Sequence, residues 1–466
     1  MHDVEAWLAA AQDATIETLK AFVAIPSVST DPAFAPEVVR AAAFVAQLLT
    51  AAGLMDATIH ATAGHPVVTA AWWGRPGAPT LLVYGHYDVQ PPDPLDKWTH
   101  PPFSASISQG RLYGRGASDD KGPMLIPIKV AQAFLATRGA LPVNLVFLFE
   151  GEEEVSSAHL AEFVMAHRDL LQADFALSAD GAQWRAELPS VITGSRGICG
   201  LEVSVTGAAK DLHSGRHGGS VPNPIQALAR LLSSLHDEAG RVAVAGFYTA
   251  VTPMSAQQRR DIAALDFDEA AYLASVGALG GGGEAGHSLL ERNWYRPTLE
   301  FNGISGGYAG PGKKTVIPAC ASAKITCRLV PEQAPDEIAA CVARHLRLHA
   351  PPNVRVDVCI ESGGAAPYAV PGDHAGLTLA ETILAEVTGI PPVRVRMGAT
   401  IPIGEIFKSC LGIETIFFSF ATSDEDYHAP NEFFRLESLA RGLIAWARYL
   451  ARLGEENARK NPYQQV

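Results

Sequence analysis

Acidic and imidazole side chains follow apolar, strand-like segments at four places in this chain. Three successive glutamates at 152–154 stand directly behind the apolar run 143–149. Three further apolar runs end in the same way, and the residues that they deliver are His86, Asp180 and His428. Open α/β sheets bind their ligands at the carboxyl ends of their strands. Adjacent buried carboxylates repel one another unless a positive charge lies between them. The sequence therefore predicts a metal site.

The donor types at this predicted site favour a hydrolytic metal. Imidazole and carboxylate ligands without thiolates are typical of catalytic Zn²⁺, Co²⁺ or Mn²⁺, whereas a structural zinc site would contain cysteines. Five ligands exceed what one open catalytic zinc requires, and one carboxylate shared between two ions accounts for the surplus. Two ions about 3.5–4 Å apart would bind a bridging water, lower its pKa and stabilise the oxyanion formed on attack. The candidate residues are His86, Asp119, Glu153, Glu154, Asp180 and His428.

One carboxylate has to remain off the metals to carry a proton. Glu153 and Glu154 can divide this work, because successive side chains in an extended or turning segment point in different directions. The residue types alone leave open which of the two ligates and which acts as the base. Asp88 lies two residues after His86 and could hold the other nitrogen of its imidazole.

Composition excludes several classes of protein. The 466 residues carry 48% hydrophobic and 18% charged side chains, which is ordinary for a globular protein of two domains. The net charge of −13, without a basic run, argues against a nucleic-acid or membrane partner. The six cysteines form no CxxC pair, and the first residues lack the pattern of a signal peptide. We therefore expect a cytoplasmic protein that binds neither nucleic acid nor membranes.

The order of apolar patterns predicts an α/β domain in two parts. Strand-like runs and helix-like segments alternate over 1–196 and again over 369–466. This order is typical of a three-layer αβα domain around a mainly parallel mixed sheet.

A different pattern occupies 197–368. Apolar and polar residues alternate at 201–206, 323–329 and 354–359, as in half-exposed antiparallel strands. Helix-like segments lie between these strands. The segment is therefore predicted to be a two-layer α+β domain, ferredoxin-like, inserted into the first domain.

Four motifs give the chain a resemblance to a known family. They read GHYDVQPP at 85–92, GRGASDDKG at 114–122, EGEEE at 150–154 and HAPNE at 428–432. With these motifs the chain resembles the co-catalytic di-zinc peptidases and deacylases: carnosinases, aminoacylases, glutamate carboxypeptidases, and acetylornithine and succinyl-diaminopimelate deacylases.

The resemblance implies a role for each candidate residue. Asp119 would bridge two zinc ions, with His86 and Asp180 completing one site and Glu154 and His428 completing the other. Glu153 would be the general base, and Asp88 the partner of His86.

Motifs of the inserted domain are similar to the carnosinase-like dipeptidase branch. They read KDLHSG at 210–215, GKKTVIP at 312–318 and CRLVP at 327–331. The resemblance implies that this domain is a lid and a dimerisation domain of a homodimer. His213 would reach the partner's active site and stabilise the oxyanion, and Arg328 would hold the substrate carboxylate. Thr315 and Thr400 would also contact the substrate.

The chain departs from the family pattern at two places. Relatives often read REGGSIP where this chain has RMGATIP at 396–402, and Ser156 replaces a glycine that often follows the paired glutamates. Both departures leave the candidate metal ligands intact and leave the choice of substrate open.

The function expected from the sequence is a di-metal amidohydrolase that cleaves dipeptides or short peptides with a free carboxylate. A metal-bridging hydroxide would attack the amide carbon, and Glu153 would take its proton. An N-acyl-amino-acid deacylase with the same centre is one alternative. A metal-binding scaffold without catalysis is the other.

Overall fold

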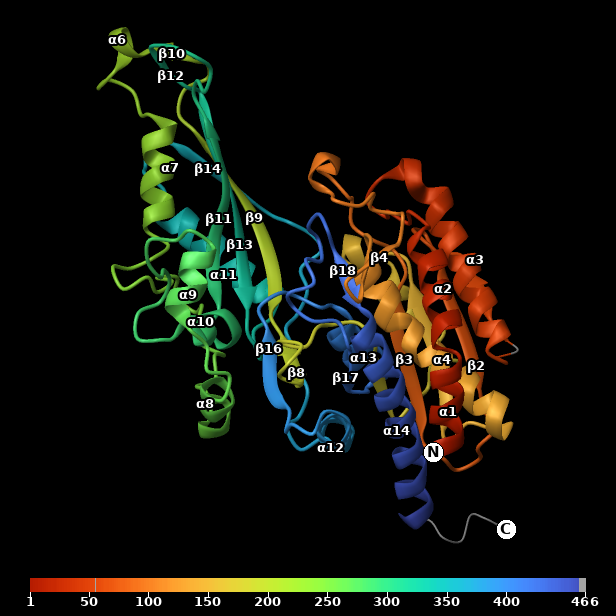
Figure 1. Ribbon diagram of the computed structural model, residues 1–466. Helices are drawn as coiled ribbons and strands as arrows, with labels where there is room; N and C mark the ends of the chain where they lie inside the picture. The colour runs from red at the N-terminus through yellow and green to blue at the C-terminus, as the bar shows by residue number, and fades with distance from the viewer. Residues whose placement is uncertain (55, 461–466) are drawn as a thin grey trace. The chain divides into compact units, whose positions relative to one another are not determined.

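The computed structural model describes residues 1–54 and 56–460 (Figure 1). Its backbone contacts divide the chain into two compact units. The second unit consists of Gly194–Ala369 and Arg396–Pro402. The first unit consists of Met1–Thr193, Val370–Val395 and the chain from Ile403 onward. The sequence predicts these boundaries at 196/197 and 368/369.

The first unit is built on a large mixed sheet. Its strand order is β1-β2-β6-β3-β7-β17-β8-β15, and β16 also pairs with β8. The four central strands are parallel to one another, and they are β3 (Thr80–His86), β6 (Asn144–Glu150), β7 (Phe175–Ser178) and β17 (Thr415–Phe417). All seven residues of β6 are buried, which explains its uninterrupted apolar sequence. The α/β prediction is confirmed, and the central strands have their carboxyl ends at one edge.

The remaining strands of this sheet lie towards its two sides. They are β1 (Thr58–His60), β2 (Val67–Trp72), β8 (Ser190–Ser195) and β16 (Val393–Met397), while β15 (Tyr368–Ala369) and the two residues of β8 that pair with it belong to the second unit. The β1–β2, β2–β6, β8–β17 and β8–β15 pairs are antiparallel, so the parallel centre has antiparallel flanks.

Helices pack on this sheet and on one another. Those of the first unit are α1 (His2–Ala10), α2 (Gln12–Val23), α3 (Ala35–Ala51), α4 (Gly122–Arg138), α5 (Leu160–Ala166), α12 (Ala375–Thr388), α13 (Ile403–Leu411) and α14 (Leu436–Lys460). Helix α4 contacts α1 and α14, so the first and last helices of the chain lie together (Figure 1). Because α4 is buried on most sides, its apolar residues do not form a single stripe.

One helix in the described part of the chain is long and apolar enough to cross a membrane. It spans Pro32–Ala51, with a mean hydropathy of 1.3 over its most apolar window. Core helices meet the same criteria, and here α3 buries Val38, Ala42, Val45 and Leu49 while contacting β1, β2 and α4. One face of α3 is therefore packed inside the first unit.

A small sheet joins distant parts of the first unit. It has the order β18-β5-β4, with β18 (Phe433–Arg435), β5 (Arg111–Tyr113) and β4 (Ser106–Ser108) antiparallel to their neighbours. Pairing of Phe433 with Tyr113 places the HAPNE motif beside the GRGASDDKG motif. These motifs are more than 300 residues apart in sequence.

The second unit is a two-layer α+β structure. Its antiparallel sheet has the order β11-β13-β9-β14, formed by β9 (Gly197–Thr206), β11 (Thr298–Gly306), β13 (Cys320–Leu329) and β14 (Arg355–Ile360). Buried residues alternate along β9, and they pack with α7 (Pro224–Ser233) and α11 (Pro335–Leu348) in one apolar core. The chain order βαββαβ is that of a ferredoxin-like fold, so this prediction is also confirmed.

Shorter elements complete the second unit. Strands β10 (Leu212–His213) and β12 (Val316–Ile317) form a two-stranded ribbon. The short helix α6 (Ser214–His217) follows β10 directly. The long connection before β11 contains α8 (Ala256–Ala263), α9 (Glu269–Ser275) and α10 (Leu289–Tyr295).

Candidate metal centre

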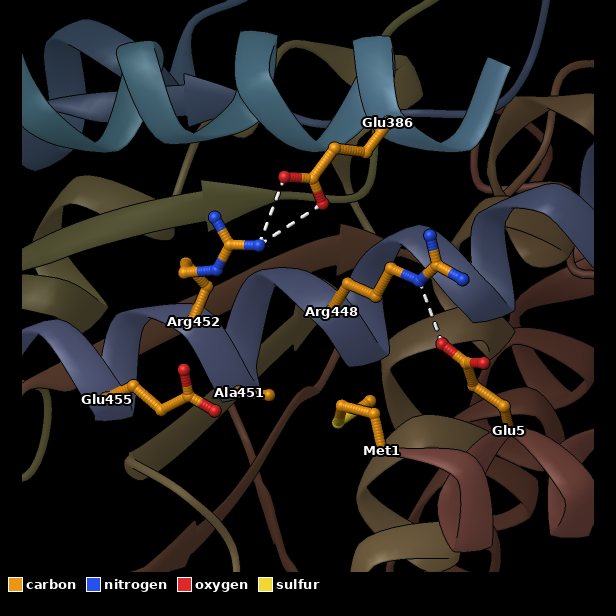
Figure 2. A pocket seen from close by; sticks show the side chains of 7 residues that line it. All are labelled: Met1, Glu5, Glu386, Arg448, Ala451, Arg452 and Glu455. Carbon is orange, nitrogen blue, oxygen red and sulfur yellow. Dashed lines mark hydrogen bonds and ion pairs between the residues drawn. The ribbon is translucent and has the colours of Figure 1, made fainter. Parts of the chain in front are cut away.

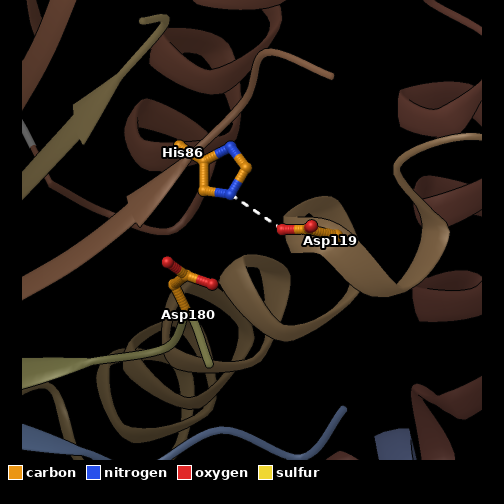
Figure 3. Close-up of side chains that lie close together, drawn as sticks. All are labelled: His86, Asp119 and Asp180. Atoms are coloured by element: carbon orange, nitrogen blue, oxygen red, sulfur yellow. Dashed lines mark hydrogen bonds and ion pairs between the residues drawn. The ribbon is translucent and has the colours of Figure 1, made fainter. Parts of the chain in front are cut away.

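The predicted metal ligands of the first unit form two groups with one shared member. His86, Asp119 and Asp180 form one group, and Asp119, Glu154 and His428 form the other, each with its ligand atoms within 4.8 Å of one another. Figure 3 shows the first group: His86 ends strand β3, Asp180 follows β7, and Asp119 reaches towards both from the segment before α4. The two groups coincide with the ligand sets that the family resemblance implies.

The carboxylate of Asp119 has one oxygen directed towards each group. Its Oδ1 lies 3.0 Å from Nε2 of His86, and its Oδ2 lies 2.9 Å from Nε2 of His428. The same His428 nitrogen is 3.1 Å from Oε2 of Glu154. A carboxylate that presents each oxygen to a different set of ligands has the arrangement needed to bridge two cations.

The donor set fits two divalent cations. It contains two imidazoles and three carboxylates, which are ligands for Zn²⁺, Mn²⁺ or Co²⁺. Within the described residues, Oε1 of Glu154 is buried and has no hydrogen-bond partner, so this oxygen is available to a ligand that the protein itself does not supply. Nδ1 of His86 lies 3.1 Å from the backbone oxygen of Asp88, which leaves Nε2 for a metal.

Without a cation the site is under electrostatic strain. Burial raises the pKa of Asp180 to about 6 and that of Glu154 to about 7, and the neighbouring Asp119 charge adds to both shifts. Burial also raises the pKa of Glu153 well above its ordinary value. Hydrogen bonds to Asp119 and Glu154 raise the pKa of His428 to about 10. The metal-free site therefore retains protons that bound cations would replace.

Asp88 connects the imidazole with the glutamate turn. Its side chain is buried, and its two oxygens accept hydrogen bonds from the backbone amides of Glu153 and Glu154 at 3.2 and 3.1 Å. Its Oδ1 is 3.4 Å from Nδ1 of His86. The sequence suggested only a contact with His86. The structure adds that Asp88 orients the turn that carries both glutamates.

Two residues near the site had no role assigned from sequence. Nε2 of Gln90 donates to Oε2 of Glu154 at 2.8 Å, and so orients this carboxylate. Glu432 is fully buried against the segment that carries Asp119. Both residues belong to motifs that the sequence displays, but only their contacts indicate what they do.

Two candidate residues of the second unit lie on its β10–β12 ribbon. His213 is exposed, and its Nδ1 accepts the backbone amide of Gly215 at 3.0 Å. Thr315 is also exposed, and its carbonyl accepts the amide of Ser214 at 2.9 Å. The ribbon therefore presents both residues to solvent in this unit.

The other two candidate residues of this unit contact each other. Nη1 of Arg328 donates to the hydroxyl of Thr400 at 2.8 Å. Arg328 lines a cavity of about 620 Å³ within the second unit, together with Arg196. Nε of Arg196 donates to the carbonyl of Gly398 at 2.7 Å, and thereby fixes the loop that carries Thr400.

One position in the loop at 396–402 leaves little room for a larger residue. A Cβ on Gly398 would lie only 1.9 Å from Oδ1 of Asn293, which itself accepts a hydrogen bond from Arg196. This close contact concerns Gly398, which matches the family pattern, whereas Ala399, where the chain departs from that pattern, is exposed. Sequence patterns gave no indication of Arg196, because its contacts lie about 100 and 200 residues away along the chain.

The first unit contains a concavity that is lined mostly by charged side chains. It measures about 320 Å³ and lies between α1, α12 and α14 (Figure 2). Arg448 pairs with Glu5 at 2.8 Å, and Arg452 pairs with Glu386 at 3.0 Å. These ion pairs join three helices, and none of the candidate metal ligands lines the concavity.

Comparisons with known proteins agree with this geometry. A sequence model of peptidase family M20/M25/M40 matches residues 82–452. The Cys-Gly metallodipeptidase DUG1 of Candida albicans is 30% identical over 464 residues, covering 94% of each chain. Human carnosine dipeptidase 1 has a similar structure, with a TM-score of 0.80 and 30% identity, covering 97% of this chain and 98% of its own.

A third similar protein is a carboxypeptidase. The M20 family metallo-carboxypeptidase Sso-CP2 of Sulfolobus solfataricus has a TM-score of 0.85 and 28% identity, covering 95% of this chain and 99% of its own. The family match spans both predicted parts of the α/β domain and all five candidate ligands. The chain belongs to peptidase family M20/M25/M40 and is a metallopeptidase.

Proposed function

We propose that this metallopeptidase hydrolyses the peptide bond of dipeptides and short peptides that carry a free carboxylate. The main observation behind this proposal is that the carboxylate of Asp119 directs one oxygen to each of two ligand groups. The names of the relatives, a Cys-Gly dipeptidase and a carnosine dipeptidase, support dipeptides as the substrate class.

The proposed cofactor is a pair of zinc ions. His86 and Asp180 would hold one ion, and Glu154 and His428 would hold the other. Asp119 would bind both ions. When bound, the ions lower the pKa of a water molecule and stabilise negative charge on the substrate oxygen. The ligand residues themselves supply fixed positions and three negative charges.

Glu153 is proposed as the general base. It belongs to neither ligand group, but it stands directly before the candidate ligand Glu154 in the same turn, and burial raises its pKa well above its ordinary value. Its backbone amide is held by Asp88. A carboxylate whose pKa is raised by burial is suited to take a proton from the attacking water and to donate it to the leaving amine.

The substrate carboxylate is proposed to bind Arg328. Its contact with Thr400 holds the guanidinium within the cavity of the second unit. We further propose that Thr315 contacts the substrate and that His213 stabilises the oxyanion from a partner subunit. The exposure of His213 on the β10–β12 ribbon supports a role at a subunit interface.

We also propose that the protein forms a homodimer through its second unit and that it is cytoplasmic. The six cysteines are free in the described residues, which supports a reducing compartment.

A substrate panel tests the function. Protein stripped of metal and reloaded with zinc, cobalt or manganese is assayed on dipeptides, their C-terminal amides and N-acyl amino acids. We expect the free dipeptides to give the highest kcat/KM, and amidation to lower it because Arg328 then loses its anionic partner. Preference for N-acyl amino acids would identify a deacylase instead. Metal binding without hydrolysis of any substrate would identify a scaffold.

Replacing Glu153→Gln should lower kcat by about 10²–10⁴-fold, because the general base is removed. Metal content, measured by elemental analysis, should stay at the wild-type level. The matched control is Glu152→Gln. The carboxylate of Glu152 is 3.0 Å from His159 and belongs to neither ligand group. A Glu153→Gln variant with wild-type turnover would contradict the assignment.

Metal should stabilise the protein more as pH rises. In the metal-free fold the pKa values of Asp180 and Glu154 are raised to about 6 and 7, so ionisation costs stability as pH rises through this range. Cations need the ionised carboxylates, so the metal-induced increase in Tm should grow from pH 5 to pH 8. A metal-induced increase in Tm that does not depend on pH would count against these two residues as ligands. In Asp180→Asn the increase in Tm should depend less on pH.

Mixed dimers test the role of His213. Subunits carrying His213→Ala are mixed with subunits carrying Glu153→Gln. If His213 acts across the interface, one of the two sites in a mixed dimer is complete, so random mixing should restore about a quarter of wild-type activity. No recovery in mixed dimers verified by native mass spectrometry would exclude action across subunits.

A further inference from the structure

Glu432 is a completely buried carboxylate whose two oxygens are both occupied by the segment before α4. Oε2 accepts hydrogen bonds from Nη1 of Arg115 at 2.7 Å and from the amide of Gly116 at 2.9 Å. Oε1 accepts the amides of Ser118 at 2.9 Å and Asp119 at 3.1 Å. Four donors from five consecutive residues thus converge on one carboxylate.

The segment that Glu432 holds needs such support. It turns sharply at Gly116, whose φ is +82°, and reaches Asp119, whose own backbone is not helical although a helix follows. In this turn the amide of Ala117 donates to the carbonyl of Gly114, whereas the amides of Gly116, Ser118 and Asp119 donate to Glu432. Glu432 supplies acceptors for three of them, and so fixes the backbone from which the Asp119 side chain projects.

Glu432 also lies close in sequence to a second candidate ligand. Only three residues separate it from His428, and the next residue, Phe433, begins strand β18. The backbone carbonyl of Glu432 accepts the amide of Gly114 at 2.9 Å, which extends the β18–β5 pairing. One residue therefore connects the backbone of His428 to the backbone of Asp119.

A second buried carboxylate strengthens the same connection. Glu425 accepts the hydroxyl of Ser118 at 2.6 Å and the backbone amides of Thr422 and Arg435 at 3.0 and 3.1 Å. The segment 422–435 is thereby fixed on both sides of His428. Glu432 differs from Glu425 in binding the amide of Asp119 itself.

We propose that Glu432 is a positioning residue that sets the separation of Asp119 and His428, and thereby determines the affinity of the ligand group formed by Asp119, Glu154 and His428. This inference rests on the proposed two-metal centre. The other group depends less on Glu432, because Asp119 is its only member that Glu432 holds, whereas His86 ends strand β3 and Asp180 follows strand β7.

The experiment measures stepwise binding of Co²⁺ by titration calorimetry and by visible absorption, with metal-free protein of the full chain. Glu432→Gln replaces one acceptor oxygen by an amide that faces donors, and Glu432→Asp keeps the charge but shortens the side chain. The control is Asn144→Ala, which removes hydrogen bonds to Arg75 and Ala78 at the opposite end of β6. This control lowers stability without touching the site.

In Glu432→Gln we expect one of the two Co²⁺ affinities to fall about 10–100-fold, as for other residues that orient metal ligands. The other affinity should change far less, and Glu432→Asp should give an intermediate loss. Asn144→Ala should bind both ions as wild type does. If Glu432→Gln does not fold, Glu432→Asp decides the question.

Two outcomes would overturn the proposal. Wild-type affinities for both ions in the Glu432 variants would show that the residue does not position a ligand. An equal loss of both affinities, in proportion to the loss of Tm, would show a general effect on stability. Wild-type protein that binds only one ion would refute the two-metal centre as well, whereas two-ion binding without dipeptide hydrolysis would refute only the substrate proposal.

Discussion

Mutual repulsion among buried carboxylates is the constraint around which the first unit is organised. Asp119, Glu153, Glu154 and Asp180 lie within electrostatic reach of one another, and burial alone makes their ionised forms costly. Such a cluster persists only if cations or protons neutralise it. The parallel centre of the sheet provides the necessary rigidity, since the ends of β3, β6 and β7 deliver ligands to one edge from buried strands.

Backbone amides are the means by which the protein holds these charges in place. Asp88 accepts the amides of Glu153 and Glu154, and Glu432 accepts those of Ser118 and Asp119. In both cases a buried carboxylate is satisfied by the main chain of the ligand-bearing turn. Ligands and the residues that orient them therefore occur within the same short motifs, and each motif serves as a unit of structure as well as of chemistry.

The sequence was sufficient to predict the strands that show a clear local pattern of apolar residues. Uninterrupted apolar runs identified β3, β6 and β7, and alternation identified β9, β13 and β14. Ten residues lie between β17 and His428, so the apolar run at 415–420 indicated this ligand less directly than the HAPNE motif did.

Contacts between distant segments were not predictable in the same way. The hydrogen bond between Arg196 and Gly398 joins residues 202 positions apart, and no period in the chain records it. Strand β16 was missed although Val393 and Val395 alternate with arginines, since five residues give a weak signal. The acceptor role of Glu432 likewise appears only once β18 has paired with β5.

The insertion of the second unit has a consequence for the order in which the centre is assembled during synthesis. A growing chain that has emerged up to Asp180 already contains the complete group of His86, Asp119 and Asp180. Glu154 must wait for His428, which emerges only after the whole second unit. Translation thus separates the completion of the two ligand groups by more than 240 residues, or roughly 12–50 seconds at the usual rates of elongation.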